Sequence, residues 1–509
     1  MKKSVIIFCF LTGLTLSVSA QVQTWEEKME SMRQRVQMKM ENQQRRVDLQ
    51  FANQMRRMWL QMQFFEGEAA PEIPEPSIPK VYDPAIRIPQ NQQEMRVIPD
   101  LNLPSDEGLV YAPDLRLNPE PEPEVSAPDP AMEADVNRMN REVQLAYFGK
   151  QMALRYDSGM EFEMASVLNV NSIADQWEQL EKTPYEYLVY QLTRQARDLK
   201  LNDWGFAILV NETAKQIYPH DKNARTLFNW FVLTKAGYIA TVSYEGNQLY
   251  LMVPSKHVLY GKSYLQGKEH KLYAIDLDGG NPELLRAKVF QAQHPEAKKV
   301  MDFQIKNTPV FPDQSKRKMM NFSYAGKTWA VPVEVNTNLV DFYETYPFVD
   351  LEIYMSAPLS ASANESMVSA LRKIVTEMPL RQGQSREAEG VNLILRFVQT
   401  AFPYKPDNEQ FGQERYLFGD ETLYYPYSDC EDRSVLFAHL VKEIMGLEVV
   451  GLLFPGHAAT AVQFTTDVPG DYVRYQNKKY VICDPTYINA DLGMVLPDVE
   501  GQSAKIVAL

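Results

Sequence analysis

Proline is distributed unevenly along this chain, and its distribution limits which segments can fold around a core. Of the 32 prolines, 14 lie between residues 68 and 131, where acidic residues are interleaved with them. Proline fixes the backbone φ angle and lacks the N–H donor, so such a segment extends as a polyproline-like chain without a core. We predict a Pro-rich linker over residues 67–131. Its short apolar pieces, such as Val97-Ile98 and residues 109–111, are expected to lie along a neighbouring surface.

The first 20 residues have the pattern of a secretory signal peptide. Lys2 and Lys3 precede an apolar run from Val5 to Leu16, and small residues end the segment at Ala20. The run is shorter than the roughly 20 apolar residues that span a bilayer. We predict cleavage after Ala20, export to a periplasmic or extracellular location, and no integral membrane segment in the mature chain.

Residues 24–65 contain neither Gly nor Pro and are rich in Glu, Gln, Arg and Met. Apolar side chains recur there at steps of three and four residues, which predicts a long amphipathic helix within residues 21–66. Such a stripe packs on the same protein or in a coiled coil, or it binds a protein partner, because Met-rich surfaces adapt to different contacts. The pattern does not choose between these interpretations.

The remainder of the chain has the composition of a globular protein. Hydrophobic residues make up 45% of the sequence, which is enough to bury a sizeable core. The net charge of −14 leaves no surplus of Lys and Arg to neutralise phosphates. Nucleic acid is therefore excluded as a non-specific partner, and so is attraction to an anionic membrane surface.

Periodicity and turn residues predict an α+β fold in three parts. These are a first globular unit (132–285), a β-rich connecting segment (286–360) and a C-terminal unit (361–509). Helices are expected over residues 132–156, 174–199, 204–218, 222–236, 363–377, 386–401 and 429–445. Strands are expected over residues 238–243, 248–253, 271–276, 447–454, 457–464 and 479–484.

The two globular units resemble each other in the order of their elements. The aligned segments are 223–233 with 432–440, Gly237 with Gly446, and 271–276 with 479–484. In this alignment Asp221 stands at the position of Cys430, and Asn247 at that of His457. We predict a tandem duplication whose first copy lost the thiol and the imidazole. The alternative is that any helix followed by a hairpin aligns this well.

Cleavage after Ala20 leaves two cysteines, Cys430 and Cys483. In an oxidising compartment such a pair is normally a disulfide. Against this, a chain of 509 residues does not depend on one disulfide for its stability. We interpret Cys483, on an apolar strand, as a small core residue.

Cys430 has the sequence context of a nucleophile. Ser428 and Glu431 have the spacing of a capping box, which places Cys430 in the first turn of a helix. The helix dipole favours a thiolate there, but Asp429, Glu431 and Asp432 oppose it. A reactive thiolate therefore requires a nearby imidazole.

His457 and Asp484 are the candidate partners of this thiol. His457 follows Gly456 and begins a strand of small residues, while Asp484 ends a strand that alternates apolar and polar residues. A thiol, an imidazole and a carboxylate in these roles form a nucleophile, its base and the group that orients the base. His439 is another imidazole, but it lies nine positions after Cys430 on the same predicted helix, too far to bond the thiol.

These segments resemble the transglutaminase-like family. The resemblance covers roughly residues 385–490 and is carried by Asp429-Cys430-Glu431-Asp432-Arg433-Ser434-Val435-Leu436, Gly456-His457-Ala458 and Tyr480-Val481-Ile482-Cys483-Asp484-Pro485-Thr486. It implies a papain-like fold, in which a helix bearing Cys430 packs on an antiparallel sheet bearing His457 and Asp484. It also implies an upstream oxyanion-hole residue, for which Tyr404 and Gln413 are the candidates. The sequence departs from the family where Ala459 and Thr460 replace a common aromatic residue.

The sequence thus predicts an exported cysteine hydrolase or acyl transferase that acts on peptide or protein amides through Cys430, His457 and Asp484. It predicts no cofactor and no metal, because residues 276–280 lack most ligand positions of a calcium loop and fit a turn instead. The alternative is a non-catalytic envelope scaffold or binding protein built on tandem transglutaminase-like domains. In that case residues 24–65 and the Pro-rich linker contact a partner.

Overall fold

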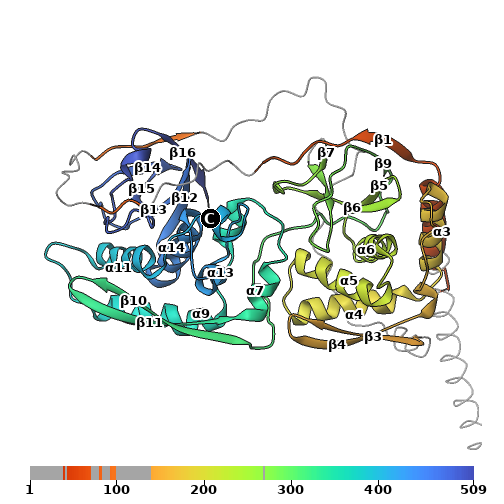
Figure 1. Ribbon diagram of the computed structural model, residues 1–509, viewed down its shortest axis with the longest axis horizontal. Coiled ribbons are helices and arrows are strands. Elements are labelled where there is room, and N and C mark those ends of the chain that lie inside the picture. Colours follow the sequence, from red (N-terminus) through yellow and green to blue (C-terminus); the bar gives the residue numbers. More distant parts are fainter. Residues whose placement is uncertain are drawn as a thin grey trace, which may run out of the picture.

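The computed structural model describes residues 38–39, 43–69, 79–82, 92–98, 139–267 and 270–508. The predicted signal peptide and most of the Pro-rich linker lie outside these residues. Within them, no helix has the length and apolar character needed to cross a membrane. The fold is α+β, and two halves with similar architecture lie side by side (Figure 1).

The first half is layered as a sheet, a set of helices and a β-hairpin (Figure 1). The hairpin consists of β3 (Arg141–Tyr147) and β4 (Lys150–Tyr156). The helices are α3 (Val170–Glu181), α4 (Tyr185–Asp198), α5 (Asp203–Ile217) and α6 (Lys222–Lys235), preceded by the short η2 (Ser158–Met160). The later strands are β5 (Thr241–Glu245), β6 (Gln248–Ser255), β7 (Tyr264–Gln266), β8 (Lys271–Ile275) and β9 (Arg286–Phe290). With β1 (Trp59–Gln63) they form a sheet in the order β1-β9-β5-β6-β8-β7.

The second half repeats these layers. Its hairpin consists of β10 (Ser315–Tyr324) and β11 (Lys327–Asn336). Its helices are α7 (Thr337–Tyr343), α8 (Leu351–Ser356), α9 (Ala361–Ala363), η3 (Asn364–Val368), α10 (Ser369–Glu377), α11 (Arg386–Ala401), α12 (Asp407–Gln410), α13 (Gly419–Tyr424), α14 (Cys430–Met445) and η4 (Pro497–Val499). Its later strands are β12 (Glu448–Phe454), β13 (His457–Gln463), β14 (Tyr472–Tyr475), β15 (Lys478–Cys483) and β16 (Ser503–Val507). With β2 (Arg96–Ile98) they form a sheet in the order β14-β15-β13-β12-β16-β2.

The two sheets share the order of five strands, but their sixth strands differ in direction, because β1 is antiparallel to β9 and β2 is parallel to β16. The order β9-β5-β6-β8-β7 corresponds strand for strand to β16-β12-β13-β15-β14, and each sheet gains an outer strand from the N-terminal part of the chain. Helix α6 contacts β6 as α14 contacts β13, and α5 contacts the first hairpin as α11 contacts the second. This shared order is what a tandem duplication predicts.

The topology changes the interpretation of the expected β-rich connecting segment, residues 286–360. Its first strand, β9, belongs to the first sheet, and its hairpin β10–β11 begins the second half. The segment also contains helices α7 and α8. It is therefore not a separate β-rich unit, because its parts pack into the two halves on either side.

The expected helix over residues 132–156 is wrong where the structure describes it. Residues 141–156 form the β3–β4 hairpin, in which Val143, Leu145 and Tyr147 are buried alternately with exposed neighbours. This period of two is that of a half-buried strand. Residues Phe148 and Gly149 make the turn with positive φ angles of 42° and 80°.

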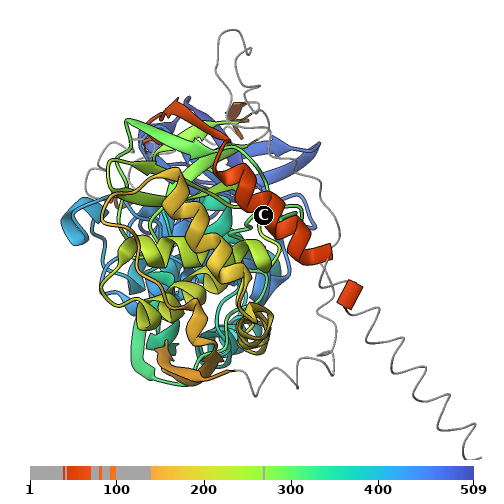
Figure 2. The same ribbon diagram turned by 90° about the vertical axis from the view of Figure 1, so that its right-hand side faces the viewer.

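The N-terminal helix ends earlier than its sequence pattern suggests. Residues 43–55 are helical, but residues 59–63 form strand β1, which pairs with β9. Figure 2 shows the helix crossing the outer end of the first half. Phe51 packs there on Trp177, with ring centroids 5.1 Å apart. The described part of the apolar stripe thus packs on its own protein.

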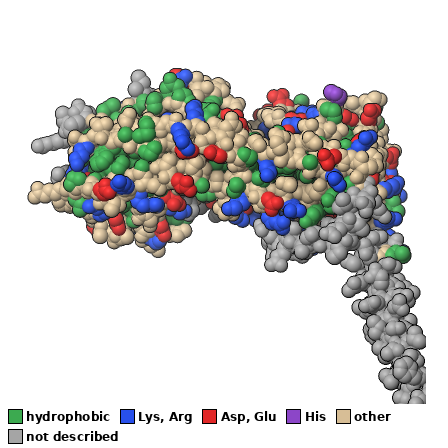
Figure 3. Space-filling model, turned by 90° about the horizontal axis from the view of Figure 1, so that it is seen from below, with side chains coloured by type: hydrophobic (Ala, Val, Ile, Leu, Met, Phe, Trp, Pro, Cys, Tyr) green, Lys and Arg blue, Asp and Glu red, His purple; other side chains and the backbone are tan. Residues whose placement is uncertain are grey.

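The prediction that Val97-Ile98 lies along a neighbouring surface is confirmed. These residues belong to β2, which pairs in parallel with β16 at the edge of the second sheet. Residues 109–111 lie outside the described residues. At the opposite side of the molecule, seen in Figure 3, the charged side chains of the two hairpins are mostly Lys and Arg, with one Glu in each hairpin. The pairs Arg317–Glu334 and Arg155–Glu142 are examples.

Candidate functional site

Cys430 is the first residue of α14, but the cap of this helix differs from the predicted one. The N-cap is Asp429, whose carboxylate accepts from the Asp432 N–H in a reciprocal capping box. Ser428 lies one residue too early and instead accepts a hydrogen bond from Arg433 Nε at 3.2 Å. Asp caps a helix at least as well as Ser, so the acidic residue takes the position.

His457 and Asp484 are brought together by neighbouring strands. His457 begins β13, and Asp484 directly follows β15, which pairs with β13. The Nε2 atom of His457 lies 2.7 Å from Asp484 Oδ2, and both side chains are buried. Burial alone lowers the pKa of His457, but the Asp484 carboxylate outweighs it and the pKa is raised. Asp484 Oδ1 in turn accepts from the N–H groups of Thr486 and Tyr487, which fixes the carboxylate.

The Cys430 thiol lies beside the same strand without bonding the imidazole. It is 0% exposed and donates to Glu431 Oε2 at 3.0 Å. Among the described residues, no hydrogen bond joins its sulfur to His457. Burial raises the pKa of the thiol well above its usual range, Glu431 and Asp429 raise it further, and the amide of Ala458 opposes them. The thiol is therefore protonated in this form and faces the residue next to His457.

The two candidate oxyanion-hole residues are placed differently. The Tyr404 hydroxyl is buried and has no hydrogen-bond partner within the described part of the chain. Burial raises the pKa of Tyr404, and Cys430 is the largest charge contribution after it. Tyr404 also pairs with Ser428, two residues before the thiol. Gln413 is exposed and lies in the wall of a cleft between the two halves.

The other sulfur and imidazole groups of the second half have structural surroundings. Cys483 is buried and free, as is Cys430, so the two thiols form no disulfide. His439 Nε2 accepts the backbone N–H of Leu359 at 3.1 Å. Burial lowers the pKa of His439 to about 4, so this ring is neutral and is not a base for Cys430.

The cleft between the halves has a volume of about 980 Å³. Tyr260 and Trp204 of the first half line it together with Tyr346, Glu414 and Tyr416 of the second half. The Glu431 carboxylate is the largest charge that acts on the Tyr416 hydroxyl. The cleft therefore reaches the side chains that surround Glu431, the hydrogen-bond partner of the thiol.

Acidic side chains around the thiol extend beyond those that the sequence indicated. Asp407 of α12 and Glu414 lie beside Asp429, with one carboxylate oxygen of each within 4.8 Å of the others. Burial raises the pKa of Glu414 to about 7, with a further contribution from Asp429. Burial likewise raises the pKa of Asp407, and Asp432 and Asp429 add to the effect. Sequence reasoning missed Asp407 and Glu414 because they are separated from Cys430 by a helix and two loops.

The first half has other residues at two of the three corresponding positions. Asp221 caps α6 as Asp429 caps α14, so the counterpart of Cys430 is Lys222 and not Asp221. His457 pairs with the last residue of β12, and Gln248 pairs with the last residue of β5, so Gln248 and not Asn247 corresponds to His457.

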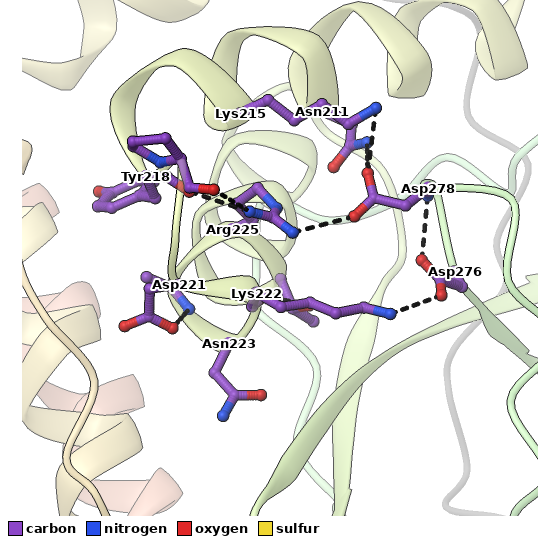
Figure 4. Close-up of polar contacts among 12 residues, drawn as sticks. Asn211, Lys215, Tyr218, Asp221, Lys222, Asn223, Arg225, Asp276 and Asp278 are labelled. Atoms are coloured by element: carbon purple, nitrogen blue, oxygen red, sulfur yellow. Dashed lines mark hydrogen bonds and ion pairs between the residues drawn. The ribbon is translucent and has the colours of Figure 1, made fainter.

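The counterpart of Asp484 is Asp276, which directly follows β8. Lys222 Nζ reaches Asp276 Oδ2 at 2.8 Å, in an ion pair that Figure 4 shows beside the contact of Arg225 with Asp278. The first half therefore keeps the acidic residue after the strand, but it has neither a thiol nor an imidazole at the other two positions.

A scan against protein-family models, a search of curated proteins and a search of solved structures each returned no match. The interpretation of the site accordingly depends on its residues and their geometry.

Proposed function

We propose that the protein is an exported cysteine hydrolase or acyl transferase of transglutaminase-like type, acting on peptide or protein amides in the periplasm or outside the cell. The observation that carries this proposal is the buried 2.7 Å hydrogen bond between His457 and Asp484. Strand β13, which begins at His457, is the strand that faces the Cys430 thiol. A carboxylate that holds one imidazole nitrogen leaves the other available to a nucleophile. A Cys-bearing helix packed on an antiparallel sheet is also the arrangement of a papain-like fold.

The proposed reaction begins with transfer of the Cys430 proton to His457. The sulfur then attacks the amide carbonyl carbon, while the Tyr404 hydroxyl and the Cys430 N–H donate to the oxyanion. His457 gives its proton to the leaving amine, and a thioester remains on Cys430. Water or a second amine cleaves the thioester and restores the thiol, so the products are those of hydrolysis or of transamidation.

The site around Cys430 is closed in this structure and has to open for this reaction. The thiol is 0% exposed and donates to Glu431, so substrate binding must both admit the amide and release the thiol from that bond. The segment at Tyr404 is a candidate cover, because its backbone pairs with Ser428 directly before the capping residue. The cleft between the halves is the proposed approach for an extended peptide.

A second candidate function is a non-catalytic envelope scaffold or binding protein. The bond between the buried thiol and Glu431 favours it, and so does the ion pair of Lys222 with Asp276 in the first half. In this proposal both halves serve as rigid modules. The N-terminal helix and the Pro-rich linker then supply the contacts with a protein partner.

The deciding experiment offers a mixture of glutamine-containing peptides to the mature chain, with and without a primary amine, and follows the products by mass spectrometry. We expect amide hydrolysis products, or adducts with the amine, from the wild type and from Cys483→Ala. We expect neither from Cys430→Ala or His457→Gln. Turnover by Cys430→Ala equal to that of the wild type would sink the enzyme proposal.

Thiol labelling supplies an independent readout. In the Cys483→Ala background, Cys430 is the sole thiol of the mature chain, and its alkylation by iodoacetamide can be followed directly. We expect peptides to accelerate alkylation if they open the site. Protection of the thiol under all conditions, together with a protein crosslink that requires residues 21–131, would favour the scaffold.

A further inference from the structure

The cleft between the halves has an acidic wall on the side of the second half. Asp341 of α7 and Glu344, the C-terminal cap of that helix, are exposed, and Glu414 is half-buried. In the described part of the chain, none of these three carboxylates forms an ion pair with Lys or Arg. Burial raises the pKa of Asp341 and of Glu414, and a basic ligand beside them would oppose this effect. This wall therefore presents negative charge to a chain that enters the cleft.

The basic side chains that line the cleft do not neutralise this wall. Arg415 forms an ion pair with the buried Glu421. Lys215, on the wall of the first half, pairs with Glu212 at 2.7 Å. Lys262 donates to a backbone carbonyl of the first half at 3.1 Å, and burial lowers its pKa. Each of these three cations is thus held by other partners.

Two buried tyrosines provide a separate indication of a ligand. Tyr343 and Tyr416 line the cleft, and each is 2% exposed. Neither hydroxyl has a hydrogen-bond partner among the residues that the structure describes. A buried hydroxyl without a partner costs free energy, and folded proteins rarely leave one. Because a tyrosine hydroxyl both donates and accepts, the backbone amides of a peptide in the cleft would satisfy both residues.

Aromatic rings of both halves meet in this cleft. The ring of Tyr260 lies 5.0 Å from that of Phe348, which lies 4.7 Å from that of Tyr416. The Tyr260 N–H donates to the Phe348 carbonyl at 2.9 Å, so the backbone joins the two halves at this point. Aromatic faces attract cations, and guanidinium groups in particular stack on them. The cleft therefore combines preformed aromatic surfaces with carboxylates that lack a cation.

We infer that the cleft binds an extended peptide with arginine side chains, whose guanidinium groups pair with Asp341, Glu344 and Glu414. Arginine fits this cleft because its planar group bonds a carboxylate and stacks on an aromatic ring. The net charge of −14 favours the approach of a basic chain. Glu414 lies beside Asp429, the cap of the helix that begins with Cys430, so a peptide bound there lies next to the candidate site. As a statement about the substrate the inference depends on the proposed function, whereas the binding itself does not.

The test measures binding to the full mature chain carrying Cys430→Ala, which has no nucleophile for the proposed reaction. The probe is a fluorescently labelled peptide of repeated Gly-Ser-Arg units, and its counterparts have Gln or Glu in place of Arg. Fluorescence anisotropy at low salt should show the Gln peptide binding at least about tenfold more weakly than the Arg peptide, and no binding of the Glu peptide. Salt should weaken the binding of the Arg peptide. A guanidinium group is not an acyl acceptor, so this binding is distinct from that of an attacking amine.

Variants without the carboxylates locate the binding. Asp341→Asn, Glu344→Gln and Glu414→Gln should each weaken binding of the Arg peptide by about two- to fivefold, and their combination by about tenfold or more. Glu377→Gln removes an exposed carboxylate of α10 outside the cleft and changes the net charge by the same amount. This control should bind the Arg peptide as the parent protein does.

Three results would overturn the inference. These are equal binding of the Arg and Gln peptides, equal weakening by Glu377→Gln and by the cleft variants, and tighter binding of a neutral sugar chain such as chitotetraose than of the Arg peptide. Failure of the proposed function has a different signature, because the wild type would then bind the Arg peptide without cleaving it. Conversely, turnover of neutral peptides by the wild type, as fast as that of basic ones, would retain the proposed function and overturn this inference.

Discussion

The two halves share one strand order, yet they differ at two of the three positions that define the candidate site. The second half has Cys430, His457 and Asp484 where the first half has Lys222, Gln248 and Asp276. In both halves the acidic residue that follows β8 or β15 binds a nitrogen presented from its own half, either the Lys222 ammonium or the His457 ring. The carboxylate at this position is thus common to both halves. Whether a half can carry out the proposed chemistry depends on the residues at the other two positions.

The largest expected effect comes from exchanging the imidazole for the residue of the other half. His457→Gln should lower kcat/KM for amide turnover by about 10²–10⁴-fold, because it removes the group that moves the proton. Lys222→Ala removes the corresponding first-half ion pair and should leave kcat/KM within about twofold of the wild type. Steady-state kinetics with a peptide that the wild type turns over measures both. Equal losses in the two variants would mean that the halves do not divide the chemistry as proposed.

The next effect concerns the buried ammonium of the first half. Lys235→Met leaves Asp48 and Glu181 together without their cation, and breaking such a buried pair costs about 3–5 kcal/mol of folding free energy. Urea unfolding of the full chain measures this loss. Glu414→Gln is the matched change in the second half, where no Lys or Arg of the described residues pairs with this carboxylate, and it should cost nothing or stabilise. A Lys235→Met variant as stable as the wild type would show that Asp48 and Glu181 need no cation. It would also weaken the contrast between the buried acidic side chains of the first half and those near Glu414 in the second half.

Much of the second half could be predicted from the sequence. Helix α11 covers residues 386–401 as expected, and α14 and the strands β12, β13 and β15 begin or end within one residue of their predicted bounds. These elements have strong apolar runs ended by glycine or proline, so local propensity and burial agree. The proximity of His457 and Asp484 followed from the same strands, because both residues stand at strand ends.

Where local propensity and tertiary pairing disagree, the sequence predicted the wrong element. Residues 141–156 contain good helix formers, but their alternating burial is satisfied only by the β3–β4 hairpin. The strand β1 likewise depends on its partner β9, more than 200 residues later. Asp407 and Glu414 could not be connected with Cys430 because a cluster of side chains from separate segments leaves no spacing in the sequence.

A smaller effect is expected from acidification of the second half. The pKa of His439 lies at about 4 in the folded chain, below its unfolded value of about 6.5, because burial disfavours the imidazolium. The unfolded chain therefore binds the extra proton first. The contribution of the neutral ring is complete above pH 6.5 and is lost as the pH falls toward 4, by up to about 3 kcal/mol.

Urea unfolding of His439→Gln between pH 7 and pH 4.5 checks this expectation. The amide of Gln can accept the Leu359 N–H but does not titrate, so the variant should lose less stability than the wild type over this range. Parallel pH dependence in the two proteins would contradict the assignment of His439 as a buried neutral ring.

The smallest effect has the opposite sign and acts where the two halves meet. His257, after β6 of the first half, lies 3.7 Å from Asp350 of the second half and 3.8 Å from Asp302. Asp302 and Asp350 raise the pKa of His257 to about 9, against a smaller opposing effect of burial. The stabilisation is therefore complete below about pH 6.5, the unfolded pKa, and is lost as the pH rises through about 9. For partly exposed pairs it amounts to about 1 kcal/mol and weakens with salt.

His257→Gln should accordingly be less stable than the wild type at pH 6 and equal to it at pH 10, as measured by urea unfolding at low salt. The backbone of Val258 still donates to Asp350 in the variant, so the halves remain joined and only the charged contact is removed. A difference that persists unchanged at pH 10 would assign the role of His257 to packing. The contact between the halves would then be independent of pH, and His439 and His457 would remain as histidines whose shifted pKa values make stability depend on pH.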